Sequence, residues 1–222
     1  SESSKQFYEM CVIDPRFAKA HREGDIHIHD MDFYTLTTTC CQIELRKLFK
    51  GGFSTGHGVL REPNDISSYA ALACIAIQSN QNDQHGGQSV PKFDFDMAPG
   101  VAKTYRRSYR RNLAKACELL CPLQADSDGL TTVLDRTFAQ LAEQLGCPDE
   151  SVESAQRFAQ KYSYEETERA TYHAMESLIL DLNTMHSRAG AQTPFSSLNY
   201  GTDTSPEGRM VIRSLLLAEQ SG

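Results

Sequence analysis

Two histidines stand one residue apart among carboxylates, with His27 and His29 inside the segment Asp25–Asp32. Polar and apolar residues alternate there, which predicts a strand with both imidazoles on one face. Such a face could bind a divalent metal together with the nearby carboxylates. The same groups could instead hydrogen-bond around the mouth of an active site and hold its shape. The two-histidine pattern is short and common, so the second interpretation is favoured.

Two adjacent cysteines, Cys40 and Cys41, could carry redox chemistry. Neighbouring residues on a strand point to opposite faces, and adjacent cysteines do not readily form a disulfide with each other. One thiol can therefore pack in the core while the other lines a site. Two small buried residues are an equal alternative. The functional alternative is a redox thiol that donates electrons and pairs with a cysteine elsewhere.

Two loops could bind an anion. His85–Ser89 contains paired glycines, which let backbone N–H groups approach a phosphate, and it adds glutamine and serine donors. Gln192–Ser197 could offer hydroxyl and backbone donors in the same way. Each segment could also be an ordinary structural element, the first a tight turn and the second the start of a strand.

One predicted helix carries a basic face whose members are spaced three and four residues apart. A solvated face is the commoner explanation, and a contact with a phosphate-bearing effector or a subunit is the functional one. The members of this face are Lys103, Arg106, Arg107, Arg110, Arg111 and Lys115.

The elements that must position these groups alternate between helices and strands. In the first half we expect a helix over 7–23 ended by Gly24, a strand over 25–30 with Ile26 and Ile28 facing the core, and a strand within 33–43. Asp65 is a plausible N-cap for a helix through Ser79. This helix is apolar almost all round, so we expect it to be buried or in an interface. A polar loop should follow over 80–89.

In the second half we expect helices over 99–120, 165–186 and 206–220, and a strand over 193–200. Pro99 suits the first turn of its helix. Residues 124–151 give no clear pattern, and 188–192 read as a loop of small residues. Strands alternating with long helices predict an α/β architecture, with an open sheet or part of a barrel.

The composition excludes several classes of function. The 222 residues have 40% hydrophobic and 23% charged residues, as in an ordinary globular protein. The net charge of −7 argues against direct nucleic-acid binding. The apolar runs are too short to span a membrane, and residues 1–6 have no export signal, so we expect a cytoplasmic protein. None of the seven cysteines forms a CxxC pair, which argues against a structural zinc site.

Several longer motifs, taken in order, resemble the anaerobic (class III) ribonucleotide reductases. They are Asp25–Asp30, Thr38–Gln42, Lys50–Gly58, Gln81–Ser89 and Ala191–Gly201. The resemblance runs from about residue 20 to the end of the chain. Several long motifs in the right order are more specific than any single short pattern.

The resemblance implies an α/β fold, half of a ten-stranded α/β barrel of the glycyl-radical enzyme and ribonucleotide reductase type. It implies that residues 1–222 are a single partial domain from the N-terminal part of the catalytic barrel, with the ATP-cone and the C-terminal glycyl-radical region absent. The implied reaction is the radical reduction of ribonucleoside triphosphates to 2′-deoxyribonucleoside triphosphates. The isolated chain would be incomplete and inactive.

The implied cofactor is a glycyl radical outside this chain, formed by a radical-SAM activating enzyme. The implied partners are the ribonucleoside triphosphate substrate, ATP and dNTP effectors, a formate or thioredoxin-type reductant and a second copy in a homodimer. No metal is expected in this segment, and neither nucleic acid nor membrane is expected to bind it directly.

The resemblance also implies site residues. Cys40 would be the first-strand thiol, with Cys41 as the second choice. His27, His29 and Asp30 would organise the barrel mouth. The substrate-binding residues would be His85, Gly86, Gly87, Gln88, Ser89, Thr193, Pro194, Phe195, Ser196 and Ser197. The effector or interface residues would be Asp65, Ser68, Tyr69, Lys103 and Arg107.

Two competing functions are kept open. One is a nucleotide-binding fragment without catalysis. The other is a metal-dependent hydrolase that uses His27 and His29.

Overall fold

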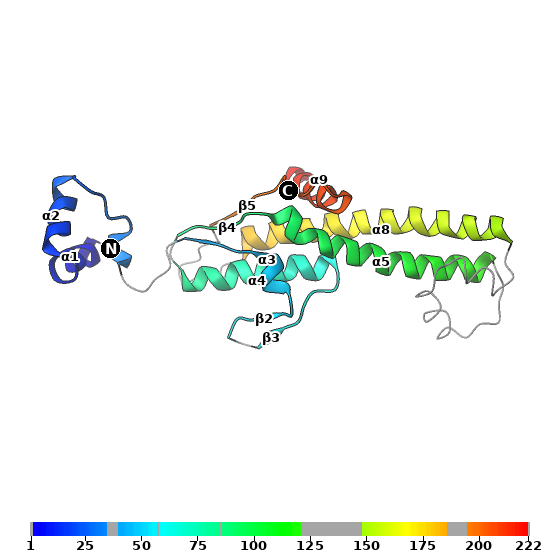
Figure 1. Ribbon diagram of the computed structural model, residues 1–222, viewed down its shortest axis with the longest axis horizontal. Coiled ribbons are helices and arrows are strands. Elements are labelled where there is room, and N and C mark those ends of the chain that lie inside the picture. The colour runs from blue at the N-terminus through cyan, green and yellow to red at the C-terminus, as the bar shows by residue number, and fades with distance from the viewer. Residues whose placement is uncertain are drawn as a thin grey trace.

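The fold is mixed α/β, mostly helical with small sheets, in a computed structural model (Figure 1). The structure describes residues 2–34, 40–56, 58–84, 86–120, 148–185 and 195–221. Residues 35–39 of the strand expected within 33–43, residues 124–147 of the unclear region 124–151 and the expected loop 188–192 lie outside these residues. So do His85, Thr193 and Pro194 of the predicted substrate site.

A three-stranded parallel sheet is the centre of the fold. Its strands are β1 (Cys41–Gln42), β4 (Gln88–Val90) and β5 (Ser196–Leu198), in the order β1-β4-β5. Cys41 pairs with Gln88, and Gln88 pairs with Ser196; the next pairs are Gln42 with Ser89 and Ser89 with Ser197. Parallel neighbours joined through helices are the expected α/β pattern. The ten-stranded barrel remains a prediction.

Four long helices pack against this sheet and each other. They are α4 (Ile66–Asp83), α5 (Phe93–Leu120), α8 (Asp149–Thr184) and α9 (Pro206–Ser221). Figure 1 shows α5 and α8 side by side, running in opposite directions and extending beyond the sheet. The main core joins all four helices, with Ile77, Phe93, Met97, Met175 and Val211 fully buried in it.

The start of α4 confirms the predicted cap. Asp65 accepts a 2.8 Å hydrogen bond from the Ser68 N–H, and the Ser68 hydroxyl accepts one from the Asp65 N–H at 3.1 Å. This reciprocal pair satisfies two N–H groups that the first helical turn leaves without partners. The helix is buried against α5 and α8, as its apolar sequence predicts.

Three helix boundaries differ from the sequence prediction. The segment 80–89 is not one loop, because α4 continues to Asp83 and β4 begins at Gln88. The helix expected from Pro99 begins at Phe93, so Pro99 lies inside α5; Asp94 and Asp96 in its first turn favour that earlier start. The helix expected from Glu165 begins at Asp149.

The N-terminal unit, residues 2–34, has a small core of its own made of Ile13, Ala18 and Met31. The single helix expected over 7–23 is wrong. Asp14 caps a second helix by accepting from the Arg16 N–H at 2.9 Å, and Pro15 starts it, so the unit has α1 (Glu2–Cys11) and α2 (Pro15–Glu23). Gly24 ends α2 with φ +83°, as predicted.

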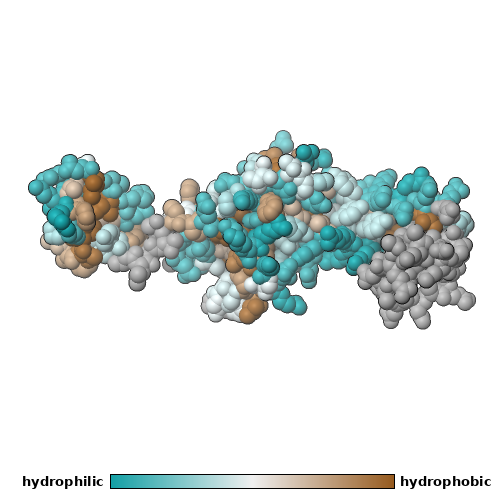
Figure 2. All heavy atoms as spheres, in the orientation of Figure 1, coloured by the Kyte–Doolittle hydropathy of each residue, from teal (hydrophilic) through white to brown (hydrophobic). Residues whose placement is uncertain are grey.

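The strand expected over 25–30 is also wrong. No strand occurs there; Asp30 has a left-handed φ of +48° and precedes η1 (Met31–Phe33). Ile26, expected in the core, is 42% exposed. Figure 2 shows apolar atoms over α1 and α2, where Phe7, Met10 and Phe17 are exposed.

A short helix and a hairpin link β1 to α4. They are α3 (Leu45–Phe49), β2 (Phe53–Ser54) and β3 (Val59–Leu60), with β2 and β3 antiparallel. Gly52 has φ +84°, and a Cβ there would collide with the Leu60 carbonyl oxygen, so the hairpin requires glycine at this position. None of the helices among the described residues has the length and apolarity to cross a membrane.

Candidate functional site

Along the first strand, β1, exposed and half-buried side chains alternate. Along β1 and its flanks Cys40 and Gln42 are exposed, whereas Cys41 and Ile43 are half-buried. Cys41 and Ile43 point toward the helices, so Cys40 and Gln42 point to the opposite side of the sheet. We call this side the open face. Parallel register partners point the same way, so Ser89 and Ser197 share the open face with Gln42.

A cavity of about 490 Å³ lies along these strands. Its volume falls in the range of small-ligand sites. Cys40, Gly87 and Phe195 lie one residue before the first paired positions of their strands, and they line the cavity together with the two serines. The structure therefore brings the predicted thiol and the described parts of both predicted anion-binding loops into one site. Its lining residues are Cys40, Cys41, Gln42, Gly87, Gln88, Ser89, Phe195, Ser196 and Ser197.

The two glycines of the β4 loop are required for different reasons. Gly86 has φ +108°, a conformation that disfavours other residues. Gly87 packs against the Phe195 ring. A Cβ on residue 87 would lie only 2.9 Å from the ring atom Cδ1, so a larger residue would collide with the ring. Phe195 is 80% exposed, so its ring forms an apolar wall of the cavity.

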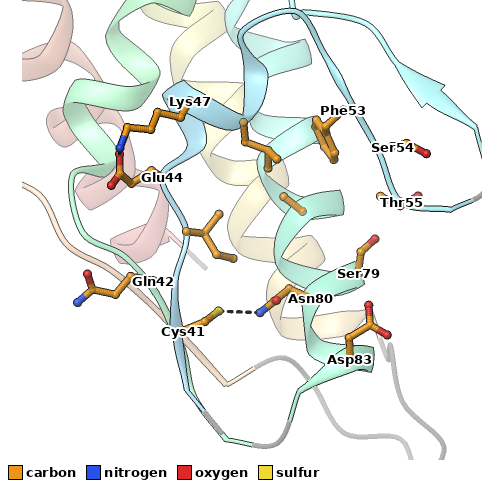
Figure 3. A pocket seen from close by; sticks show the side chains of 13 residues that line it. Cys41, Gln42, Glu44, Lys47, Phe53, Ser54, Thr55, Ser79, Asn80 and Asp83 are labelled. Atoms are coloured by element: carbon orange, nitrogen blue, oxygen red, sulfur yellow. Dashed lines mark hydrogen bonds and ion pairs between the residues drawn. The ribbon is translucent and has the colours of Figure 1, made fainter. Parts of the chain in front are cut away.

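The two adjacent thiols have different environments. Cys40 is exposed at the open face, while the Cys41 Sγ accepts a 2.9 Å hydrogen bond from the Asn80 amide of α4. Figure 3 shows these two side chains pointing toward each other. A third thiol, Cys74, is buried within α4, and that burial, followed by the nearby charge of Asp181, raises its pKa to about 11. Cys40 is thus the thiol in this region that is free to meet a ligand at the open face.

Gln88 lines the cavity, but its side chain does not face it. Its side chain is 4% exposed, and its amide donates to the Ile77 carbonyl at 2.9 Å and to the Gln81 Oε1 at 3.2 Å. The side chain therefore ties β4 to α4 and is turned away from the open face. A residue whose register partner, Cys41, points toward the helices must do the same.

Two buried carboxylates at the start of α5 accept hydrogen bonds from the backbone segments that follow β1 and β5. Asp94 Oδ2 accepts from the Gly201 and Asp203 N–H groups at 2.9 and 2.8 Å, after β5. Burial alone would raise the pKa of Asp94, but these donors outweigh it and lower the pKa. Asp96 accepts from the Leu45 N–H at 3.1 Å, after β1, and burial raises its pKa.

A second cavity, of about 680 Å³, lies behind β1 between α3, the hairpin and α4 (Figure 3). Its floor is apolar, with Ile43, Leu48, Phe53 and Ala76. Its rim is polar and includes the ion pair of Glu44 with Lys47, whose charged atoms are 2.7 Å apart. Cys41 lines both cavities, so β1 is the wall between them.

The histidines of the N-terminal unit contact each other and line neither cavity. The His27 and His29 ring centroids are 5.9 Å apart, and His29 Nε2 lies 3.3 Å from the Asp30 carboxylate. Figure 1 shows the unit at one end, away from the sheet. Within the described ranges, no group of three or more histidine, cysteine or acidic side chains could hold a metal ion. The organising role of His27, His29 and Asp30 at a barrel mouth stays a prediction.

The five predicted effector or interface residues lie together where α4 meets α5. Arg107 pairs with Asp65 at 3.0 Å, and Lys103 Nζ lies 5.3 Å from the Tyr69 ring centroid. Ser68 belongs to the Asp65 cap. Lys103 also pairs at 2.9 Å with Glu62, which the sequence analysis did not identify. The Lys103 hydrogen bond lowers the pKa of the Glu62 carboxyl.

Comparison with known proteins identifies similar sequences. The family model described as anaerobic ribonucleoside-triphosphate reductase matches residues 1–222. Proteins of that name from Salmonella typhimurium and Escherichia coli are each 26% identical over 215 residues, or 96% of this chain and 25% of theirs. The Enterobacteria phage T4 protein of the same name is 26% identical over 200 residues, or 89% and 26%. The chain spans about a quarter of the length of these relatives.

Proposed function

The chain belongs to the anaerobic ribonucleoside-triphosphate reductase family, and on that premise we propose that it supplies the first-strand thiol and part of the nucleotide site for ribonucleotide reduction. The reaction replaces the ribose 2′-hydroxyl with hydrogen and releases water. Its two electrons come from formate or a thioredoxin-type dithiol. The chemistry starts from a glycyl radical carried outside these residues and made by a radical-SAM activating enzyme.

The observation that carries the proposal is the exposed Cys40 thiol on the open face, beside a cavity with hydroxyl and backbone donors. A ribose in that cavity would meet Cys40. Its phosphates would meet the Gly86–Gly87 backbone and the hydroxyls of Ser89 and Ser197, since neutral donors suit a phosphate. His85, Thr193 and Pro194 keep their proposed substrate-binding role from the resemblance, and Ser196 contributes through its backbone.

The contact between α4 and α5 is the proposed effector or dimer region. Its residues combine cations, a carboxylate and an aromatic ring at one helix N-terminus. Cations there suit a phosphate. ATP and dNTP effectors, a homodimer, a cytoplasmic location and completion of the sheet into a ten-stranded barrel belong to the same proposal.

The hydrolase alternative is not proposed, because its strand of two histidines does not form among the described residues and no three-ligand group stands beside His27 and His29.

The test combines this chain with the remaining part of the Escherichia coli relative, its activating enzyme and formate under anaerobic conditions. Deoxynucleotide formation from a ribonucleoside triphosphate is measured, after co-purification has established that the two parts associate. Product above the level given by either part alone supports the proposal. Association without product contradicts it.

A binding experiment on this chain alone is the second arm. Alkylation of Cys40 and Cys41 by iodoacetamide is mapped by mass spectrometry with and without ribonucleoside triphosphate, and tripolyphosphate serves as the control. The proposal predicts that the nucleotide slows alkylation at Cys40 more than at Cys41. Equal rates at Cys40 with and without saturating nucleotide would contradict the assigned site.

A further inference from the structure

Behind the Cys40 thiol, the side of the sheet that faces the helices carries a series of hydrogen-bonded side-chain amides. The Asn80 side-chain N–H₂ donates to two acceptors, the Cys41 Sγ at 2.9 Å and the Gln88 Oε1 at 2.7 Å. Cys41 and Gln88 are register partners on β1 and β4. One amide of α4 therefore joins the two strands where the open-face site begins, and Figure 3 shows its contact with Cys41.

This series of hydrogen-bonded amides continues into α4 through Gln88. The Gln88 amide donates to the Ile77 carbonyl and to the Gln81 Oε1, and both Gln88 and Gln81 are only 4% exposed. Buried amides cost free energy when a partner is removed, because water cannot replace it. Each amide here has a protein partner, so α4 holds the Gln88 side chain in one orientation.

The backbone hydrogen bond between β1 and β4 is longer at this point than two residues further on. The Cys41 N–H donates to the Gly87 carbonyl at 3.3 Å, whereas two residues further on the Ile43 N–H donates to the Ser89 carbonyl at 2.8 Å. β1 and β4 share only two paired positions. The Asn80 side chain therefore adds a second connection between the two strands next to the longer bond.

We infer that Asn80 is a positioning residue of the open-face site: its amide clamps β1 to β4 from behind and thereby fixes Cys40 relative to Gly87 and Phe195. The inference deepens the proposed function and rests on it for the role of Cys40. The clamp itself is a property of this chain and can be measured without turnover.

The first experiment is amide hydrogen exchange on the 222-residue chain at neutral pH, with the Cys41 N–H as the reporter. Asn80→Leu keeps the size of the side chain and removes both donors, and we expect Cys41 exchange to accelerate about tenfold. Asn82→Leu is the matched control, because Asn82 is exposed on the same helix and its amide donates to the Gln78 carbonyl of that helix. Equal exchange in these two variants would overturn the inference.

The second experiment separates hydrogen bonding from shape. Asn80→Asp keeps the shape, but its ionised carboxylate has no donor, so we expect exchange as fast as in Asn80→Leu at neutral pH. Protonation of the Asn80→Asp carboxylate returns one O–H donor. The protection of the Cys41 N–H, measured relative to Asn82→Leu, should therefore recover in Asn80→Asp as the pH falls below about 5. It should not recover in Asn80→Leu. An Asn80→Asp chain that exchanges like wild type at neutral pH would show that donation from residue 80 does not hold the strands.

The third arm uses the reconstituted reductase. Asn80→Leu should lower kcat while leaving KM within about twofold, because the substrate contacts on the open face are intact. Unchanged kcat together with faster Cys41 exchange would show a clamp without a positioning role. A wild-type reconstitution that makes no product would count against the proposed function, and the exchange experiments would still decide the clamp.

Discussion

Replacing Asp94 tests how the start of α5 holds the chain that follows β5. Asp94 is fully buried, and it accepts from two backbone N–H groups and from the Thr202 hydroxyl at 3.1 Å. Hydrogen bonds to a charged acceptor contribute about 1.5–3 kcal/mol each and are not additive. Asp94→Ala leaves both N–H groups without an acceptor, so we expect a loss of about 4 kcal/mol in the free energy of unfolding.

Asp94→Asn separates the charge from the shape. The amide oxygen can accept from both N–H groups and the amide nitrogen can donate to Thr202, so only the charge assistance is lost, about 1–2 kcal/mol. The assay is urea unfolding monitored by circular dichroism at pH 7. The control is Asp83→Asn at an exposed position of α4, for which we expect no measurable change.

The pH dependence has a definite sign. Hydrogen bonds lower the pKa of folded Asp94 below its unfolded value, against the effect of burial. A lowered folded pKa gives stability that is fully present above the unfolded pKa of about 3.9 and is lost as the pH falls through the folded value. The advantage of wild type over Asp94→Asn should thus be constant from about pH 5 to 8 and vanish in stronger acid. An advantage that grows on acidification would refute this reasoning.

Three further predictions concern single side chains. Because burial raises the pKa of Cys74 to about 11, native-state alkylation at pH 8 should be roughly a hundredfold slower than at the exposed Cys11, as measured by mass spectrometry. Gly87→Ala should cost about 1–3 kcal/mol in urea unfolding through the clash with Phe195, and Phe195→Ala in the same chain should restore most of it. Asp65→Ala should cost about 1 kcal/mol by removing the α4 cap, whereas Asp65→Asn should cost less than about half of that because asparagine also caps.

Each of these has a clear contrary result. Alkylation of Cys74 as fast as that of Cys11 would mean that the core around α4 opens. Unchanged stability in Gly87→Ala would mean that the Phe195 ring does not rest on Gly87. Equal losses in the two Asp65 variants would assign the effect to the Arg107 ion pair instead of the cap.

The sequence predicted those elements whose signals are local. Asp65 with its apolar helix, Gly24 after α2 and the amphipathic α9 all follow rules that act within a few residues. The break at Asp14-Pro15 carried an equally local signal, an N-cap followed by a first-turn proline, and was missed because the helical pattern of 7–23 outweighed it. Alternation over 25–30 failed as a strand signal, and no strand within the described ranges pairs with that segment.

The site was predicted in its residue types and only partly in its geometry. Cys40 and the β4 and β5 loops meet as expected, because parallel strands align the segments that precede them. The direction of Gln88 depends on its register with Cys41, and the role of Asn80 depends on how α4 packs behind β1. Neither is encoded in spacing along the chain. The same holds for Asp94 and Asp96, whose partners lie 107 and 51 residues away in sequence.

We propose Cys40, and not its neighbour Cys41, as the thiol that takes part in ribonucleotide reduction. The most direct measurement compares Cys40→Ser and Cys41→Ser in the anaerobic reconstitution, after both variants are shown to associate with the complementary part. We expect Cys40→Ser to yield no deoxynucleotide above the blank, while Cys41→Ser still yields product. Product from Cys40→Ser at the wild-type rate, or loss of product in Cys41→Ser alone, would show that Cys40 does not have this role.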